Sequence, residues 1–546
     1  MPDTASLNQS PPWSDIDEFS TNTPLVEAVA RHDAGWAADK LREVGALVGS
    51  APFQGWAETA NASPPVLRTH DRDGNRVDEV VYHPAYHEVL GRALAAGAHS
   101  WAWREPGPGA HVARAACFML FAQVEPGHAC PVSMTHSAVA ALRVQPEAAE
   151  RWEVPATALS YDPRLAPVGD KRTALFGMAM TERQGGSDVR ANTTEARPVD
   201  GEGPGGEYRI DGHKWFCSAP MSDAFLMLAQ TPAGPSCFLV PRVLPDGERN
   251  PFVIDRLKDK LGNRANASAE IRLEDTRGFM VGEPGRGVPT IIEMVNHTRL
   301  DCVLGTAAGM RQCVTEAGWY AAHRRAFGAL LVDQPLMTNV LADLCLESEA
   351  ATALGLRLAR AYDVDAGEEE VAFRRLATAV GKYWVCKRGP QHAGEAVECL
   401  GGNGYCETFP LARRYREQPV MSIWEGSGNV MCLDVLRAAR RQPETIEAFL
   451  AEVDLGAGAD RLLDEHVNAL RRELGTGGFD PGSARRLVEA MALALQASLL
   501  VRFAPTVVAD AFTASRLGAE RGAQFGTLPA WASHRVIVDR HLPIAA

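Results

Sequence analysis

The chain has 546 residues, of which 46% are hydrophobic and 23% charged. This is typical of a soluble globular protein with several packed domains. The formal net charge of −13 argues against a surface that binds nucleic acid everywhere, although a local cluster of arginines can still bind phosphate. The eleven cysteines include no C-x-x-C pair, which indicates reduced thiols in a cytoplasmic protein and argues against a disulfide framework or a metal site.

Neither the N-terminal residues nor the most apolar stretch of the chain predicts a targeting or membrane segment. Residues 1–20 are polar and rich in Ser and Pro, which predicts a loose tail or a packing arm, and they show no secretory signal. The most apolar stretch, 490–501, is interrupted by Gln496. It is shorter than the ~20 residues needed to span a membrane, so we predict a buried helix there and no membrane partner.

Three changes of pattern divide the rest of the chain. Residues 21–172 repeat apolar side chains at helical spacing and predict an N-terminal helical domain. Short β-rich runs separated by Gly, Asp and Pro turns predict a middle antiparallel β domain over 173–288. Helical patterns return over 289–440, and 441–546 predicts an extra helical C-terminal domain. Helices, then strands, then helices indicate an α+β fold with segregated layers.

The first stretch with chemical content is MAMTERQGGSDV at 178–189. Its glycines let the backbone approach a planar or phosphorylated ligand, and its hydroxyls can hydrogen-bond that ligand. Taken alone, the stretch is better explained as a glycine turn capped by Ser and Asp.

Four more segments follow in order, namely HKWFCS at 213–218, HRRAFG at 323–328, ECLGGNGYCE at 398–407 and IWEGSGNVM at 423–431. In residue type, order and spacing the five segments resemble the acyl-CoA dehydrogenase family over about residues 80–440. The resemblance implies that family's fold and FAD as cofactor. It also implies a homo-oligomer, commonly a tetramer, because the family builds its FAD site across a dimer contact.

The same resemblance assigns cofactor-binding residues motif by motif. They would be Met178, Met180, Thr181, Gly186, Ser187, Trp215, Phe216, Ser218, Arg324, Phe327, Gln334, Gly401, Gly402, Ile423, Trp424, Ser427 and Asn429. Arg324, Phe327 and Gln334 correspond to residues that reach the FAD of a neighbouring subunit. Two positions depart from the family pattern. Cys217 replaces a Thr that bonds the flavin, and Glu398 replaces a Gln.

Glu425, in WEGSGN, stands at the position of the family's catalytic glutamate. Removing a proton next to a thioester needs a positioned carboxylate, and the flavin serves as the electron sink. The alternative is a helix N-terminal Glu favoured by the helix dipole. Short-branched-chain members place their glutamate before an arginine in an earlier helix, where this chain has Thr298–Arg299. Arg299 is a thioester-side residue or a member of a plain ion pair.

Within the family, the chain most resembles the members connected with the response to DNA alkylation. That resemblance implies binding of double-stranded DNA through the C-terminal region. From 441 onward, eleven Arg and no Lys stand against thirteen Asp and Glu, so the arginines are either a phosphate-binding face or solvated, paired charges. The candidate DNA-binding arginines are Arg437, Arg440, Arg441, Arg471, Arg472, Arg485, Arg486, Arg516 and Arg521.

The leading hypothesis is therefore an FAD protein that binds duplex DNA without sequence preference and limits alkylation damage, with at most weak acyl-CoA dehydrogenase activity. One alternative is a metabolic dehydrogenase for branched or bulky acyl-CoA. The other is a non-catalytic protein that shields DNA and holds FAD as a structural ligand.

Overall fold

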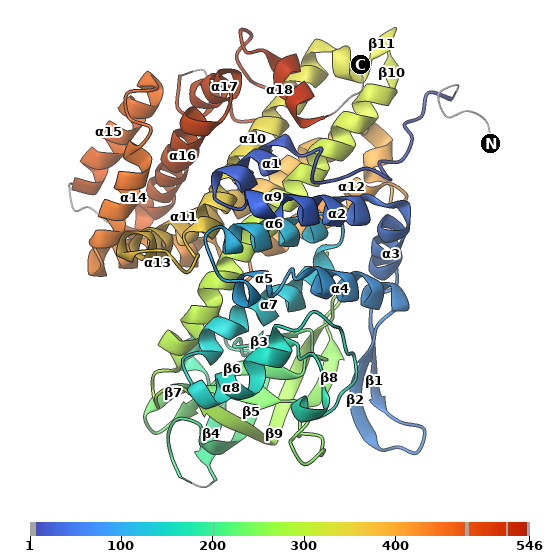
Figure 1. Cartoon of the computed structure of the whole chain (residues 1–546), viewed down its shortest axis with the longest axis vertical. Coiled ribbons are helices and arrows are strands. Elements are labelled where there is room, and N and C mark those ends of the chain that lie inside the picture. The colour runs from blue at the N-terminus through green and yellow to red at the C-terminus, as the bar shows by residue number, and fades with distance from the viewer. Residues whose placement is uncertain (1–6, 200, 476–479, 520–521, 543–546) are drawn as a thin grey trace. The chain divides into compact units, whose positions relative to one another are not determined.

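A computed structural model describes residues 7–199, 201–475, 480–519 and 522–542 of the chain (Figure 1). The chain forms two compact units, each assembled from separate stretches of sequence. The first, which we call the helical unit, comprises residues 1–51, 106–124 and 299–546. The second, the β-containing unit, comprises residues 52–105 and 125–298.

The β-containing unit is organised around a seven-stranded sheet. Its strands are β3 (Phe176–Ala179), β4 (Glu195–Pro198), β5 (Glu207–Ser218), β6 (Ala224–Thr231), β7 (Gly234–Pro241), β8 (Val253–Leu257) and β9 (Ser268–Val281). The order is β3-β6-β4-β5-β9-β7, and β7 also pairs with β6, so the path closes on itself. Most pairings are antiparallel, whereas β3 and β4 each pair with β6 in parallel. Inward-facing side chains such as Ile210, Phe225 and Phe238 fill the core.

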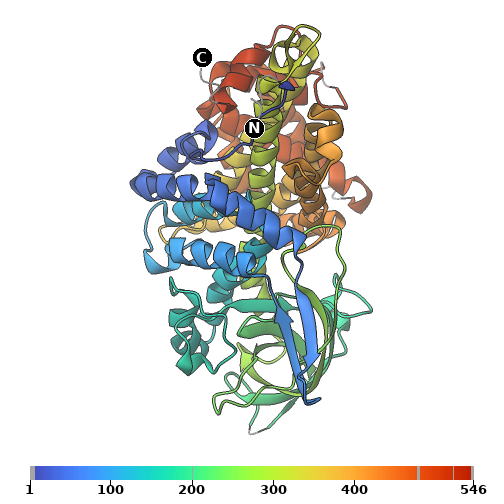
Figure 2. The same ribbon diagram turned by 90° about the vertical axis from the view of Figure 1, so that its right-hand side faces the viewer.

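Helices and a hairpin complete this unit. The helices are α3 (Ala51–Ala62), α4 (Pro84–Ala96), α5 (Trp101–Arg104), α7 (Pro126–Leu142) and α8 (Pro146–Ala156). Strands β1 (Val66–His70) and β2 (Arg76–Val81) form a hairpin inside the stretch predicted to be helical, and β1 contacts β8 (Figure 2). The turn between them, DRDGN at 71–75, is the local signal that helical periodicity overlooks.

The helical unit contains a bundle, which combines helices of the predicted 289–440 domain with three from the predicted N-terminal domain, and the helices α14 to α18. The bundle comprises α1 (Thr23–Arg31), α2 (Ala38–Gly49), α6 (Ala110–Ala122), α9 (Gly287–His323, from Arg299 onward), α10 (Pro335–Arg360), α11 (Glu368–Cys399), α12 (Pro410–Met421) and α13 (Gly428–Arg441). A short hairpin, β10 (Arg325–Ala326) and β11 (Ala329–Leu330), follows α9. The further helices are α14 (Glu444–Asp454), α15 (Arg461–Gly475), α16 (Ala484–Phe503), α17 (Thr506–Arg516) and α18 (His534–His541).

Helix α16 joins the extra helices to the bundle. It is buried on nearly all sides over Leu487–Leu500 and contacts α10, α11 and α13 as well as α14, α15 and α17. This explains the apolar stretch at 490–501, because a helix that is apolar all round belongs in a core. Among the residues that the structure describes, no helix is long and apolar enough to cross a membrane.

The described part of the N-terminal stretch packs against the bundle as an arm. Trp13 and Phe19 are buried, and the Trp13 ring lies 5.0 Å from the ring of Trp319 on α9. The buried Glu18 accepts hydrogen bonds from the Trp13 indole (2.7 Å) and from Gln312 (3.0 Å). The helix–strand–helix architecture with an extra C-terminal helical region confirms the predicted fold class.

Candidate functional site

The loop between α12 and α13 carries Trp424, Glu425 and Gly426. Buried cationic side chains donate hydrogen bonds to the backbone carbonyl groups of all three residues. Lys382 on α11 donates to the carbonyl oxygens of Trp424 (2.7 Å) and Gly426 (2.6 Å). Arg299 on α9 donates through Nε to the carbonyl oxygen of Glu425 (3.1 Å). Charge-assisted hydrogen bonds of this kind are stronger than neutral ones, so the loop is fixed from two helices.

This fixation matters because Glu425 adopts a left-handed backbone conformation, with φ of +58°. A non-glycine residue pays for such a conformation, which persists only where surrounding contacts impose it. The Glu425 side chain is partly exposed. The loop therefore presents one carboxylate at a defined place, as a general base requires.

Arg299 belongs to an ion-pair network, which supports the second of the two roles considered for it. Its Nη1 lies 2.9 Å from Asp434 on α13, and Arg375 on α11 contacts the other oxygen of the same carboxylate at 3.0 Å. Burial alone would raise the pKa of Asp434, but the two guanidinium groups lower it below its usual value. Asp434 therefore stays ionised and holds Arg299 in reach of the Glu425 carbonyl.

Several predicted cofactor residues of the helical unit have backbone or side-chain atoms that a ligand can reach. A Cβ added to Gly401 or Gly402 would meet no atom within 4 Å, so this backbone is open to a ligand. Ser427 is exposed and makes no capping hydrogen bond at the start of α13. Asn429 is exposed and accepts a hydrogen bond from Arg485 Nε (2.8 Å) on α16. Residues of the extra helices thus contact the predicted cofactor segment, which the sequence did not reveal.

Two further members of that set have distinct surroundings. The Trp424 indole nitrogen is buried without a hydrogen-bond partner among the described residues, whereas Ile423 is 63% exposed. Both residues precede Glu425 in the loop that Lys382 and Arg299 hold. An unpaired buried donor is costly and is usually explained by a missing partner.

The three residues predicted to reach a neighbouring subunit lie at or beside the β10–β11 hairpin. Phe327 is fully exposed at its tip, with φ of +51°. Arg324 donates to the carbonyl oxygen of Asn8 in the N-terminal arm (2.9 Å), and Gln334 donates to the carbonyl oxygen of Ala326 (3.0 Å). A completely exposed phenylalanine on an ordered hairpin is a suitable contact for another molecule.

In the β-containing unit, a buried ion pair fixes the glycine-rich loop after β3. Glu182 Oε1 lies 2.9 Å from Lys214 Nζ on β5, and neither side chain has any exposure. The same carboxylate accepts hydrogen bonds from Gln184, Thr193 and Thr194. Sequence reasoning missed both members of this pair, although each is adjacent to a predicted site residue.

The predicted site residues of this loop are arranged around Thr181. Its carbonyl oxygen accepts a hydrogen bond from the backbone nitrogen of Trp215 (2.8 Å). A Cβ on Gly186 would lie 2.5 Å from Thr181 Oγ1, which explains the glycine there. Gly186 and Ser187 are exposed, Met180 is partly exposed and Met178 is buried in β3.

The side chains that follow along β5 face different surroundings. Lys258 Nζ lies 3.3 Å from the centroid of the partly exposed Trp215 ring, a cation–π contact, and 4.7 Å from that of Phe216, which is 48% exposed. Ser218 shares a hydrogen bond of 3.2 Å with Ser268. Cys217 is completely buried in the sheet core, and burial raises the pKa of its thiol to about 12. The departure at Cys217 therefore places a neutral thiol in the core.

The candidate DNA-binding arginines differ in how far their charge is compensated. Arg471 pairs with Asp454, and Arg486 with Glu473 at 2.7 Å. Arg516 is 13% exposed and contacts both Asp343 and Glu347, so its charge is already neutralised in the interior. Arg521 lies outside the described residues. Among the candidate arginines that the structure describes, Arg437, Arg441, Arg472 and Arg485 are exposed and form no ion pair shorter than 3.6 Å.

Arg437 and Arg440 both lie exposed on α13. The nearest carboxylate to Arg437 is Asp434, at 3.6 Å, and Asp434 already serves Arg299 and Arg375. On α15 and α16 an ion-paired arginine (Arg471, Arg486) stands directly beside an exposed arginine without a close carboxylate (Arg472, Arg485), which sequence grouping alone could not separate.

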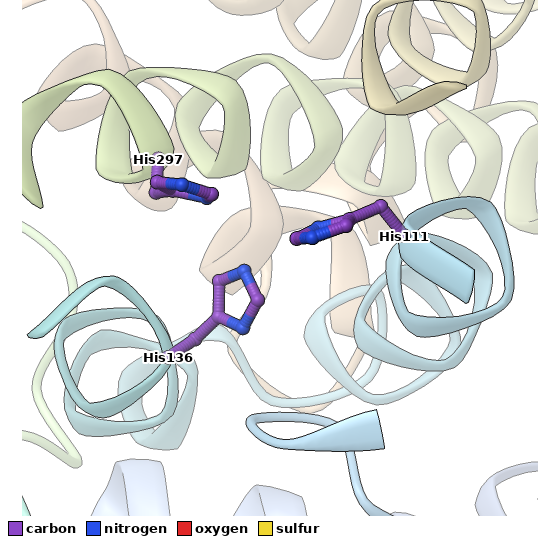
Figure 3. A group of neighbouring side chains, drawn as sticks. All are labelled: His111, His136 and His297. Carbon is purple, nitrogen blue, oxygen red and sulfur yellow. The ribbon is translucent and has the colours of Figure 1, made fainter. Parts of the chain in front are cut away.

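Two histidines lie side by side in the β-containing unit, where the sequence analysis named no site. The ring centroids of His136 and His297 are 5.2 Å apart (Figure 3). The Trp103 ring lies 5.1 Å from that of His136 and 5.4 Å from that of His297. His136 Nδ1 is 2.8 Å from the carbonyl oxygen of His99. These rings pack against one another as aromatic side chains, and the absence of a metal site stays a prediction.

Comparison with known proteins places this geometry in a family. Three family models match the chain: the adaptive response protein AidB N-terminal domain over residues 8–163, the acyl-CoA dehydrogenase middle domain over 177–276, and the acyl-CoA dehydrogenase C-terminal domain over 285–439. The putative acyl-CoA dehydrogenase AidB of Escherichia coli K12 is 46% identical over 470 residues, which cover 86% of each chain. The chain belongs to the acyl-CoA dehydrogenase family.

Solved structures extend this relationship to the extra helices. The structure titled "Bd2924 apo-form" is 27% identical, with a TM-score of 0.83, and the match covers 91% of this chain and 99% of the other. The Caenorhabditis elegans ACDH-11 complex with C11-CoA gives the same TM-score at 24% identity, covering 97% of this chain and 95% of the other. The acyl-CoA dehydrogenase fold with additional C-terminal helices is thus found in other proteins.

Proposed function

We propose that this chain is an FAD-containing protein that binds double-stranded DNA and limits alkylation damage, with at most weak acyl-CoA dehydrogenase activity. The observation that carries the proposal is the 46% identity to E. coli AidB over 86% of both chains, together with the match to an adaptive response N-terminal domain. In this proposal the protein acts in the cytoplasm as a homo-oligomer, a tetramer as in much of the family.

The proposal of FAD as cofactor is supported by residues that fit such a group. The open backbone at Gly401 and Gly402 admits a close approach, and the exposed Ser427 and Asn429 offer hydrogen bonds at the start of α13. When bound, FAD would accept the hydride equivalent that leaves an acyl-CoA. Glu425 would take the proton from the neighbouring carbon, because Lys382 and Arg299 fix the loop that presents its carboxylate.

DNA binding is proposed to use the exposed arginines whose charge is not consumed by a close carboxylate. They are carried by α13, α15 and α16, and α16 contacts both of the other helices. The region is slightly acidic overall, so only such a local arrangement can attract a phosphate backbone. No base-reading segment is apparent, and binding should therefore tolerate any sequence and weaken strongly with salt.

The DNA proposal is tested by fluorescence anisotropy with a labelled mixed-sequence duplex, titrated at several salt concentrations. Arg441→Gln and Arg472→Gln should each weaken binding and reduce the slope of log K against log salt by about 1. Arg486→Gln is the matched control, because Arg486 already pairs with Glu473. The wild-type chain failing to bind duplex, or all three variants behaving alike, would contradict the proposal.

A metabolic acyl-CoA dehydrogenase remains the second candidate, and the intact Glu425 loop favours it. The test is anaerobic mixing of the purified protein with short, branched and long acyl-CoAs while the visible flavin band is followed. Rapid bleaching that is lost in Glu425→Gln would place the metabolic reaction first. A bound but unresponsive flavin would favour the DNA-protective function, and a protein purified without flavin would contradict the cofactor proposal.

A further inference from the structure

A cavity of about 360 Å³ lies entirely within the β-containing unit. Its walls come from the end of β2, the first half of α4, the loop at 161–165 and the segment at 219–223 that follows β5. This volume falls in the range of small-molecule sites. None of the residues assigned to FAD, acyl-CoA chemistry or DNA lines it.

Aromatic rings form a large part of the wall. The rings of Tyr82 and Tyr86 are stacked, with centroids 4.4 Å apart and planes 15° from parallel. His87 and Tyr161 form a second stacked pair at 5.7 Å and 28°. Tyr86 and His87 meet edge to face at 5.9 Å, which joins the two pairs. Such a surface favours a flat ring, because aromatic faces prefer offset stacking or edge contacts.

One buried hydroxyl group on the wall lacks the hydrogen-bond partner that burial normally demands. Ser222 is 2% exposed, and its hydroxyl has no hydrogen-bond partner among the described residues. Leaving such a group unsatisfied costs about 1–3 kcal/mol. The Ser222 hydroxyl can both donate a hydrogen bond to a ligand and accept one from it. Tyr86 is 3% exposed, and its ring also lines the cavity.

The charged groups of the wall, in contrast, are already compensated within the unit. Asp223 contacts Lys171 Nζ at 2.5 Å and accepts from the backbone nitrogen of Leu175 at 2.7 Å. Asp162 pairs with Arg164 at 2.6 Å. Glu79 likewise pairs with Arg249 at 2.7 Å. A ligand with a net charge would have to break one of these pairs, so the cavity suits a neutral molecule.

We propose that this cavity is a binding site for a neutral, planar heterocycle that carries adjacent donor and acceptor groups on one edge. The ring faces the Tyr86 and Tyr161 side of the wall, and the polar edge meets the hydroxyl group of Ser222. The site is separate from the proposed flavin and DNA functions, and its ligand is neither of them.

The test uses quinazolin-4-one as probe and 2-piperidone as its non-aromatic control, with affinities measured on the full chain by ligand-observed NMR titration. We expect saturable binding of quinazolin-4-one and at least ~10-fold weaker binding of 2-piperidone, since 2-piperidone keeps the lactam N–H and C=O but lacks the fused aromatic rings. Ser222→Ala should weaken the probe by about 5- to 10-fold, the usual worth of one hydrogen bond. Tyr86→Leu should weaken it further.

Ser498→Ala is the matched control, because Ser498 is equally buried but donates to the carbonyl oxygen of Val453 at 2.8 Å. It should leave the affinity unchanged. Thermal melting of each variant shows whether the fold is kept, and the comparison of Ser222→Ala with Ser498→Ala carries the test if Tyr86→Leu unfolds. Absence of saturable binding, equal binding by 2-piperidone, indifference to Ser222→Ala, or displacement of the probe by FAD would overturn the proposal.

Discussion

Lys214→Met removes the cation that holds the glycine-rich loop to β5. In the native structure the Lys214 ammonium lies 2.9 Å from Glu182 and 2.8 Å from the carbonyl oxygen of Leu228, and both side chains of the ion pair are completely buried. Methionine has a similar length and fills the same apolar path. The substitution therefore isolates the lost charge and its hydrogen bonds from any change of packing volume.

The expected loss of stability depends on the hydrogen bonds that Glu182 retains. Removing one member of a buried ion pair costs about 3–5 kcal/mol, because it leaves an uncompensated charge. Glu182 keeps hydrogen bonds from Gln184, Thr193 and Thr194, so we expect the lower end of that range. A loss of about 3 kcal/mol corresponds to roughly 150-fold more frequent opening of the loop.

The assay is hydrogen exchange measured by mass spectrometry on peptides that cover 178–194, because local opening governs their protection. We expect protection to fall by about two orders of magnitude in Lys214→Met. Adding Glu182→Gln should restore part of it, since the double variant contains no unpaired charge. Exchange that stays within about threefold of wild type, or a double variant less protected than Lys214→Met, would refute the reasoning.

The pH dependence of the stability lost in Lys214→Met provides an independent test. Burial raises the pKa of Glu182, but the Lys214 ammonium and the hydrogen bonds outweigh it, so the net pKa lies well below the usual range. The ionised carboxylate thus contributes stability above its unfolded pKa of about 4.3, and this contribution is lost as pH falls through the depressed folded pKa. Without Lys214 that pKa rises, so the penalty of Lys214→Met should be largest at neutral pH and shrink on acidification.

Three other perturbations test separate parts of the structure. Arg485→Gln removes the hydrogen bond to Asn429 and should lower the affinity for FAD a few-fold in a flavin titration. An unchanged affinity would show that α16 does not support the cofactor segment. Burial lowers the pKa of His392 to about 4, so the unfolded chain binds a proton at this residue before the folded chain does. The free energy of unfolding of the wild type, measured in urea, should therefore fall by about 3 kcal/mol more than that of His392→Gln between about pH 6.5 and 4. Gly49→Ala places a methyl group 1.8 Å from a backbone carbonyl oxygen and should lower the melting temperature. Gly55→Ala meets no atom within 4 Å. It should raise the melting temperature slightly, because alanine stabilises a helix by up to about 1 kcal/mol relative to glycine.

Much of the fold could be predicted because its signals are local. The 3.6-residue period of the helices, the turn residues between strands and the order of the five motifs are all written in short segments. The hairpin at 66–81 was missed because it is brief and lies among strong helical patterns. The arm around Trp13 and Glu18 could not be separated from a loose tail, because its burial depends on Trp319 and Gln312, about three hundred positions away in sequence.

The sequence by itself determined which residues we propose for the chemistry, notably Glu425 and the glycine-rich loop, since each stands in a short motif. The tertiary structure alone decided what holds them in place. Arg299 reaches the Glu425 carbonyl across 126 positions, and Arg516 is neutralised by Asp343 across 173. Charge compensation depends on which distant side chains meet in space, and no local pattern encodes that. The same reason separates the arginines that can still bind phosphate from those already paired.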